Sequence, residues 1–198
     1  MGAPGGSPPG SLPTVAFSGR SNVGKSSLIN RLLGRTRSAI ARVSNRPGKT
    51  QEINFYRTRA RQEAGTSSRD FEFFLADLPG YGFARAPGSS RDRWKPMIES
   101  YLASPDLRGV VQLLDSRHGA TPEDVQMLHW LSDRGVPALV VLTKVDKLKG
   151  NARRKEMAAR MNELSLPEDQ VLAVSATTGE GCDALLDSME SLILDESA

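Results

Sequence analysis

The sequence predicts a three-layer α/β fold, in which a mostly parallel six-stranded sheet with one antiparallel strand carries helices on both faces. Short apolar runs alternate with amphipathic segments along most of the 198 residues. Such alternation is typical of a parallel sheet that is covered on both sides. Polar motifs directly follow several of the apolar runs, as expected where ligands bind at the carboxyl ends of parallel strands.

Six strands and five helices are expected. The strands are residues 15–17, 52–59, 71–77, 109–114, 137–142 and 171–174. The second and third strands, joined by the polar stretch 60–70, read as a hairpin and supply the antiparallel strand. The clearest helix start is Thr121 as cap with Pro122 at the first position, followed by two acids. The helices are residues 27–33, 91–103, 122–133, 151–164 and 181–194.

Length and composition predict a single domain over residues 14–198, after a disordered tail of Gly, Pro and Ser at residues 1–13. The longest apolar stretches fall far below the roughly 18 to 20 residues of a membrane-spanning helix. The N-terminus has neither the charge nor the apolar centre of a signal or transit peptide. The single cysteine, Cys182, agrees with a reducing compartment, and a cytoplasmic location is expected.

The net charge of +3 conceals a strong asymmetry along the chain. Residues 20–61 carry eleven basic side chains and one acid, whereas residues 162–198 carry nine acids and no base. A basic block can be a solvated face or can dock on a polyanion such as RNA. Both interpretations stay open from the charges alone.

The most informative stretch is the glycine-rich segment between the first strand and the first helix. Its glycines let the backbone wrap closely around a phosphate, at the positive end of the helix dipole. Lys25 is expected to reach the outer phosphates, and the hydroxyl of Ser26 to ligate Mg²⁺. A glycine turn that merely ends in Lys-Ser is the alternative. The residues expected to bind the nucleotide here are Gly19, Arg20, Ser21, Asn22, Val23, Gly24, Lys25, Ser26 and Ser27.

Two further motifs stand at expected strand ends. Asp77 opens the sequence Asp-Leu-Pro-Gly, and a carboxylate at this place typically holds the Mg²⁺ shell, usually through water. Asp146 closes the sequence Thr-Lys-Val-Asp, where a fixed carboxylate can accept hydrogen bonds from N1–H and N2 of guanine. Adenine offers no such pair of donors, so this site selects guanine. The stem of Lys144 is expected along the purine face, and the N–H of Ala176 at guanine O6.

These motifs, together with Thr50 and Ser175-Ala176, resemble the five G motifs of Ras-like translational and ribosome-assembly GTPases. The fuller wording at residues 19–30, 47–55, 77–84 and 117–119 resembles the EngB (YsxC) family of bacterial GTPases, over about residues 14–194. The resemblance implies a Ras-like G domain that binds GTP and GDP with Mg²⁺ and hydrolyses GTP. It also implies action in late assembly of the large ribosomal subunit on its rRNA, with cell division and septation affected downstream. We further expect a monomer that binds neither membrane nor DNA.

The resemblance assigns roles to individual residues. Thr50 would meet Mg²⁺ and the γ-phosphate, and the N–H of Gly80 would also reach that phosphate. The implied catalytic residues are Lys25, Thr50, Gly80 and Asn22, and the implied metal ligands are Ser26, Thr50 and Asp77. The further nucleotide contacts it implies are Gly48, Lys49, Thr50, Gln51, Glu52, Asp77, Leu78, Pro79, Gly80, Thr143, Lys144, Val145, Asp146, Val174, Ser175 and Ala176.

One departure from Ras-like enzymes bears on rate. Tyr81 stands where those enzymes place the glutamine that orients water, so we expect intrinsic turnover of about 10⁻⁴ s⁻¹ or slower until a partner orders the loops. Asn22 could bind K⁺ through its carbonyl or bond within the glycine-rich loop. Arg117 and His118 could meet RNA or act as turn partners. These alternatives stay open.

Two other functions are alternatives to this one. The first is a septin-like GTP-binding scaffold in division with incidental hydrolysis, for which the sequence offers no coiled coil or assembly domain. The second is a tRNA-modifying or iron-transport G domain cut from a larger protein, which the apparent completeness of the chain and its lack of membrane segments disfavour.

Overall fold

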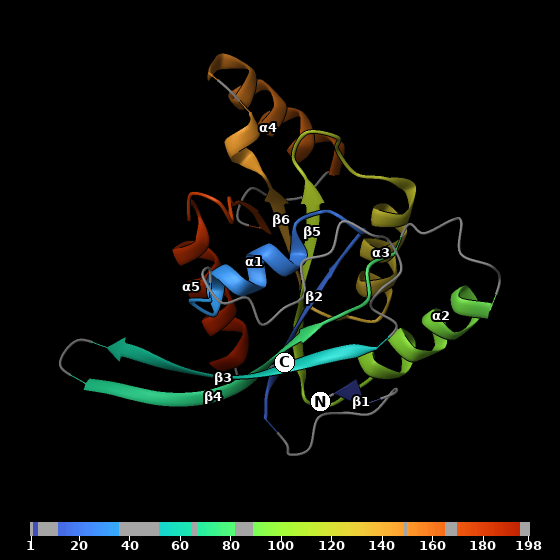
Figure 1. The fold of residues 1–198 in the computed structure, drawn as a ribbon, viewed down its shortest axis with the longest axis vertical. Helices are drawn as coiled ribbons and strands as arrows, with labels where there is room; N and C mark the ends of the chain where they lie inside the picture. Colours follow the sequence, from blue (N-terminus) through green and yellow to red (C-terminus); the bar gives the residue numbers. More distant parts are fainter. Residues whose placement is uncertain are drawn as a thin grey trace.

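The computed structural model describes residues 2–3, 12–35, 52–64, 67–81, 89–148, 150–164 and 170–194. Its centre is a sheet with the strand order β1-β3-β4-β2-β5-β6-β7 (Figure 1). Within the described residues, no helix combines the length and the apolarity that crossing a bilayer requires. The strands are β1 Gly2–Ala3, β2 Thr14–Gly19, β3 Ile53–Ala64, β4 Ser67–Asp77, β5 Leu107–Asp115, β6 Ala138–Thr143 and β7 Val171–Ala173.

The strand directions confirm the predicted fold class. β2 pairs in parallel with β4 and β5, and β6 continues the parallel sheet between β5 and β7. β3 is antiparallel to β4, as the predicted hairpin requires. The structure adds the two-residue strand β1, which pairs with Ile53 and Asn54 of β3 and lies within the segment expected to be a disordered tail.

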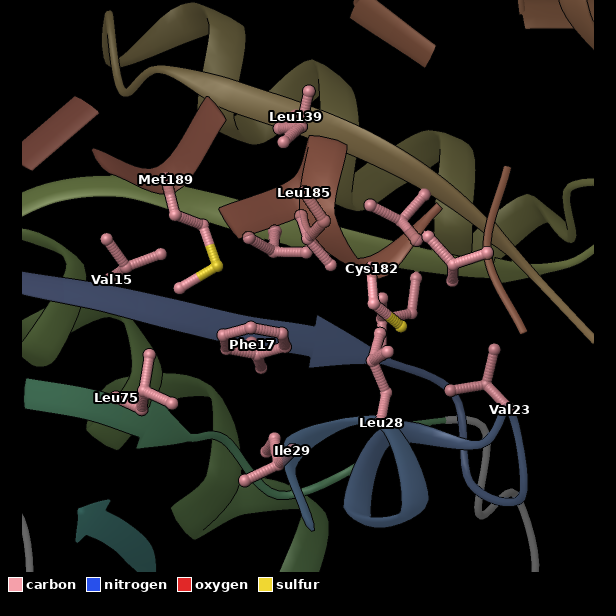
Figure 2. Close-up of a cluster of buried hydrophobic side chains, with 14 of the residues drawn as sticks. Val15, Phe17, Val23, Leu28, Ile29, Leu75, Leu139, Cys182, Leu185 and Met189 are labelled. Carbon is pink, nitrogen blue, oxygen red and sulfur yellow. The ribbon is translucent and has the colours of Figure 1, made fainter. Parts of the chain in front are cut away.

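Helices cover both faces of the sheet because the strand residues alternate between them. Val15 and Phe17 of β2 pack against α1 and α5, whereas Ala16 faces α2 and α3 (Figure 2 shows the first cluster). α4 packs on the second face against β6. The helices are α1 Lys25–Leu32, α2 Ser89–Leu102, α3 Pro122–Asp133, α4 Gly150–Leu164 and α5 Cys182–Leu194, with a short 3₁₀ helix η1 at Val145–Lys147.

The prediction of a polar loop at residues 60–70 was wrong. β3 and β4 stay paired from Asn54–Asp77 to Ala64–Ser67, so the hairpin extends well past the rest of the sheet (Figure 1). In its far half, arginines of β3 stand opposite acids of β4, and Arg61 Nε donates to Asp70 Oδ1 over 2.8 Å. Polar alternation on a solvent-exposed ribbon lacks the apolar signal by which strands are recognised, which is why this part was missed.

Candidate nucleotide-binding site

The predicted motifs meet at one edge of the sheet. Phe17 of β2 stands beside Asp77, the last residue of β4, and Asp115 of β5 stands beside Thr143, the last residue of β6. The segment after β7 joins them, because Val145 N donates to Val174 O over 3.3 Å. The structure therefore brings together the segments 19–27, 77–80, 143–146 and 174–176. Glu52 is exposed, and Gly48, Lys49, Thr50 and Gln51 lie outside the described residues.

The glycine-rich loop has the backbone shape of a phosphate cradle. Asn22 and Gly24 have positive φ values of 64° and 108°, and Gly24 caps α1 without a side-chain hydrogen bond. The first N–H groups of α1 are thus left for an anion at the positive end of the helix. A side chain on Gly19 would place its Cβ 2.9 Å from Leu113 O, so the loop can leave β2 in this way only with glycine there.

The segment after β4 runs against this loop. Leu78 N donates to Phe17 O over 3.1 Å, and Ser21 N donates to Tyr81 O over 3.1 Å. A Cβ on Gly80 would lie 2.9 Å from Ser21 Oγ and 3.1 Å from Ser21 N. Gly80 therefore permits a close approach between the two segments, with its backbone next to the cradle.

Lys25 and Asp77 form a buried ion pair between α1 and β4. The side chains are only 9% and 4% exposed. Two opposite charges removed from water stabilise each other, and loss of either partner would strand the other in a low-dielectric environment. The pair places the ammonium group and the carboxylate at the mouth of the cradle.

The residues present fit a magnesium ion carried by a nucleotide. Among the described residues, no group of three or more His, Cys, Asp or Glu side chains could hold a metal by itself. Mg²⁺ in nucleotide sites usually takes one or two protein oxygens, with substrate phosphates and waters completing its shell. The carboxylate of Asp77 and the hydroxyl of Ser26, in the first turn of α1, are oxygen donors of this kind.

The loop after β6 is fastened to the glycine-rich loop. Thr143 Oγ1 donates to Val23 O over 2.7 Å and lies 3.1 Å from Leu114 O. Lys144 has a φ of 60° and donates from Nζ to Asn22 O over 2.5 Å. A single short stretch thus fixes the distance between the phosphate cradle and the residues that follow it.

Asp146 is held in place by the loop after β7. Its Oδ1 accepts a 2.7 Å hydrogen bond from Ser175 Oγ, and Lys147 Nζ lies 3.4 Å from Oδ2. The hydrogen bond from Ser175 lowers the pKa of Asp146 against the opposing effect of burial, and Lys147 lowers it further. At neutral pH the side chain is therefore an ionised acceptor. Ser175 is itself anchored, because its N–H donates to Glu180 O over 2.9 Å.

Asp115, at the end of β5, belongs to the same edge and was missed in the sequence. It accepts a 2.9 Å bond from Lys144 Nζ and two bonds from the Arg117 guanidinium, at 2.9 and 2.7 Å. Burial alone would raise the pKa of Asp115, but the hydrogen bonds from Arg117 and Lys144 bring it well below its ordinary value. The sequence feature that could have identified Asp115 is its position as an acid directly after a buried apolar run. Arg117 thus acts as a turn partner, whereas His118 is exposed.

Tyr81 is buried and directed toward α3. Its hydroxyl donates to Asp124 Oδ1 over 2.5 Å and accepts from Gln112 Nε2. Asp124 Oδ2 closes the capping box of α3 by accepting from Thr121 N over 2.8 Å. Burial first, and then the charge of Asp124, raise the pKa of Tyr81, so the phenol stays a proton donor. The first residue after Gly80 is thereby tied to the start of α3.

We expect Tyr81→Phe to lower the free energy of unfolding by about 2 kcal/mol, because the buried Asp124 and Gln112 lose a partner. The melting temperature should fall by about 4–8 °C, measured by calorimetry without nucleotide. The matched control is Tyr101→Phe, since the buried hydroxyl of Tyr101 has no hydrogen-bond partner among the described residues. Removing that hydroxyl should cost nothing. Equal losses in both variants would contradict a stabilising role for the Tyr81 contacts.

Comparisons with known proteins agree with the geometry. The family model of the 50S ribosome-binding GTPases matches residues 14–144. The chain is 47% identical to the probable GTP-binding protein EngB of Desulforamulus reducens over 192 residues, covering 96% of this chain and 88% of that protein. It is 46% identical to the probable EngB of Gemmatimonas aurantiaca over 183 residues, covering 92% and 83%.

Solved structures show the same architecture. The crystal structure of a probable GTP-binding protein EngB superposes with a TM-score of 0.65 at 25% identity, covering 91% of this chain and 98% of that one. Era, in complex with MgGDPNP and nucleotides 1506–1542 of 16S ribosomal RNA, gives 0.67 at 22% identity, covering 94% and 58%, which is a likeness of fold alone. The chain belongs to the EngB family of GTP-binding proteins, within the P-loop GTPases.

Proposed function

We propose that this protein is a Mg²⁺-dependent GTP-hydrolysing switch that acts in assembly of the large ribosomal subunit. The observation that carries the proposal is the contact of Lys144 and Thr143 with the backbone of the glycine-rich loop. It sets a base-reading carboxylate at a fixed distance from a phosphate cradle, as recognition of a whole guanine nucleotide requires.

At the phosphate end, the N–H groups of residues 19–27 would bind the phosphate oxygens. Lys25 would turn from Asp77 to the outer phosphates, and this would leave Asp77 and Ser26 to hold Mg²⁺. The metal, when bound, would neutralise negative charge on the outer phosphates. Lys25 would exchange Asp77 for the phosphates, and Asp77 would exchange Lys25 for Mg²⁺. Both buried charges would therefore keep a partner of opposite charge when the nucleotide binds.

At the base end, Asp146 would accept from guanine N1–H and N2, with Lys144 along one ring face. Thr143 and Val145 frame the loop, while Val174, Ser175 and Ala176 would complete the pocket with the N–H of Ala176 at O6. The hydrogen bond from Ser175 supports this role, because it orients the carboxylate and favours its ionised form.

Slow intrinsic hydrolysis follows from Tyr81. Its hydroxyl is engaged by Asp124 and Gln112, so it is directed away from the loop that would hold the γ-phosphate. A ribosomal partner would then position Thr50 and Gly80 for hydrolysis. The side-chain carbonyl of Asn22 would be the ligand for an activating K⁺, and Leu78, Pro79 and residues 48–52 would line the phosphate end.

Ribosome assembly is supported by the description of the matching family model, and cell division would depend on it through ribosome supply. The cytoplasm and a monomeric state are part of the same proposal. The test is co-sedimentation with purified large subunits in a non-hydrolysable GTP analogue and in GDP. We expect clearly stronger binding with the analogue, and binding that weakens as salt is raised. Equal binding in both nucleotides without salt dependence would overturn the switch.

A further inference from the structure

The inner side of α4 is anchored by its methionines and its last leucine. Met157, Met161 and Leu164, spaced four and three residues apart, pack against the cluster of β6 and β7 residues on the sheet. Near the middle of the helix, Arg160 pairs with Glu156 and Glu163, and Arg153 at its start pairs with Glu180. These contacts hold the helix firmly beyond the carboxyl ends of β5 and β6 (Figure 1).

The outer side of α4 carries cations that have no such partners. Arg154 and Lys155 are exposed and form no ion pair with any residue that the structure describes. The first turn of α4 has no acid either. Arg154 and Lys155 lie in the second turn of α4, beyond the first turn in which the helix dipole acts. Neither an ion pair with a described residue nor the helix dipole therefore accounts for these two cations.

The charge around these two residues is strongly one-sided. Residues 144–160 carry seven basic side chains and two acids. Within this stretch Lys144, Lys147, Arg153 and Arg160 pair with acids. In the hairpin, Arg57 pairs with Glu72, and Arg59 and Arg61 pair with Asp70, whereas Arg69 is exposed and pairs with no residue that the structure describes. What distinguishes Arg154 and Lys155 is that they are neighbours in the chain and that both are exposed without an ion pair among the described residues.

We propose that the outer face of α4, marked by Arg154 and Lys155, docks on the phosphodiester backbone of ribosomal RNA. The other exposed residues in the second half of α4, Ala158, Ala159, Asn162 and Glu163, include no aromatic ring on which a base could stack, and the one acid among them, Glu163, pairs with Arg160. Nor do they form the broad apolar stripe by which a helix enters a membrane. Small side chains beside unpaired cations suit close approach to phosphates, which gives contacts that are independent of sequence.

This surface rests on the proposed function and refines it. Asp146 lies in η1, which ends at Lys147, and α4 begins at Gly150, so the loop proposed to read the base leads directly into the helix that carries the docking face. The face lies at the same edge of the sheet as the nucleotide site, with α4 above the ends of β5 and β6 (Figure 1). Ordering of the base loop by GTP would in this way also order one end of the RNA-binding face.

The test compares two double variants that remove the same charge, each made with glutamine to keep the side chains long and the helix propensity high. Arg154→Gln with Lys155→Gln removes the unpaired cations of α4. Arg57→Gln with Arg59→Gln removes two paired cations of the hairpin. Binding to large subunits and to protein-free 23S rRNA is measured with the GTP analogue, between 50 and about 200 mM salt. Circular dichroism and GTP affinity verify that both variants are folded.

We expect the α4 variant to lose about tenfold in affinity for both targets, and the slope of log K against log salt to fall by about 1.5 to 2. The hairpin variant should stay within about twofold of the unmodified protein. Equal losses in the two variants, or none in either, would overturn the docking face while leaving the switch intact. A loss on subunits but not on free rRNA would overturn it in favour of an acidic ribosomal protein. Failure of the unmodified protein to bind either target would refute the proposed function itself.

Discussion

Asp146→Asn should lower the affinity for GTP by about a thousandfold or more and make xanthosine triphosphate the better ligand. The carboxylate, oriented by Ser175 at 2.7 Å, would meet two donors on guanine. An asparagine amide presents a donor to guanine N2, which leaves two donors facing each other. Xanthine carries a carbonyl at that position, so the same amide N–H finds an acceptor there.

Calorimetric titration with GTP, XTP and ATP measures this change in both proteins. The matched control is Asp183→Asn, which makes the same chemical change at an exposed position in the first turn of α5. It should leave all three affinities as they were. An Asp146→Asn protein that keeps its affinity for GTP, or that accepts XTP no better than the unmodified protein does, would show that this carboxylate does not read the base.

Lys25→Ala should lower the free energy of unfolding by about 3–5 kcal/mol in the absence of nucleotide, because it leaves the buried carboxylate of Asp77 unpaired. For a chain of this length the melting temperature should fall by about 6–20 °C. The same variant should lose GTP hydrolysis, since the ammonium group that reaches the outer phosphates is gone. Thermal unfolding and single-turnover hydrolysis measure the two effects separately.

A double variant distinguishes the structural part of this effect from the chemical part. Lys25→Met together with Asp77→Leu replaces the ion pair by apolar side chains of similar length, which should restore most of the lost stability. Hydrolysis should stay absent, because neither the cation nor the metal-holding carboxylate returns. A stability loss below about 1 kcal/mol in Lys25→Ala would contradict a buried, structurally important pair. Hydrolysis by the double variant would refute the catalytic role.

The sequence predicted the order of strands and helices because each element carries its own periodic pattern. The apolar runs around Phe17, Val111 and Val141 are buried strands in the structure. The cap of α3 at Thr121 could be predicted from the sequence because the cap, the proline and the acids stand next to one another in the chain. Local chemistry of this kind needs no knowledge of distant residues.

Contacts between residues far apart in the chain could not be predicted in this way. Tyr81, Gln112 and Asp124 come from three separate elements, and no pattern in the chain predicts that one phenol would join them. The role of Asp115 is of the same kind, because it depends on Lys144, which directly follows β6. The far half of the hairpin was missed since a two-stranded ribbon in water has no buried face to impose an apolar alternation.

By itself, the sequence determined the fold class and the strand ends at which the glycine-rich loop, Asp77 and Asp146 stand, because periodicity and turn chemistry act between neighbours in the chain. The tertiary structure alone decided that Lys25 pairs with Asp77, that Lys144 fastens one loop to another, and that Arg154 and Lys155 stay unpaired among the described residues. Each of these depends on which charges the folded sheet brings within a few ångströms of one another, and electrostatic energy is set by that distance and by burial.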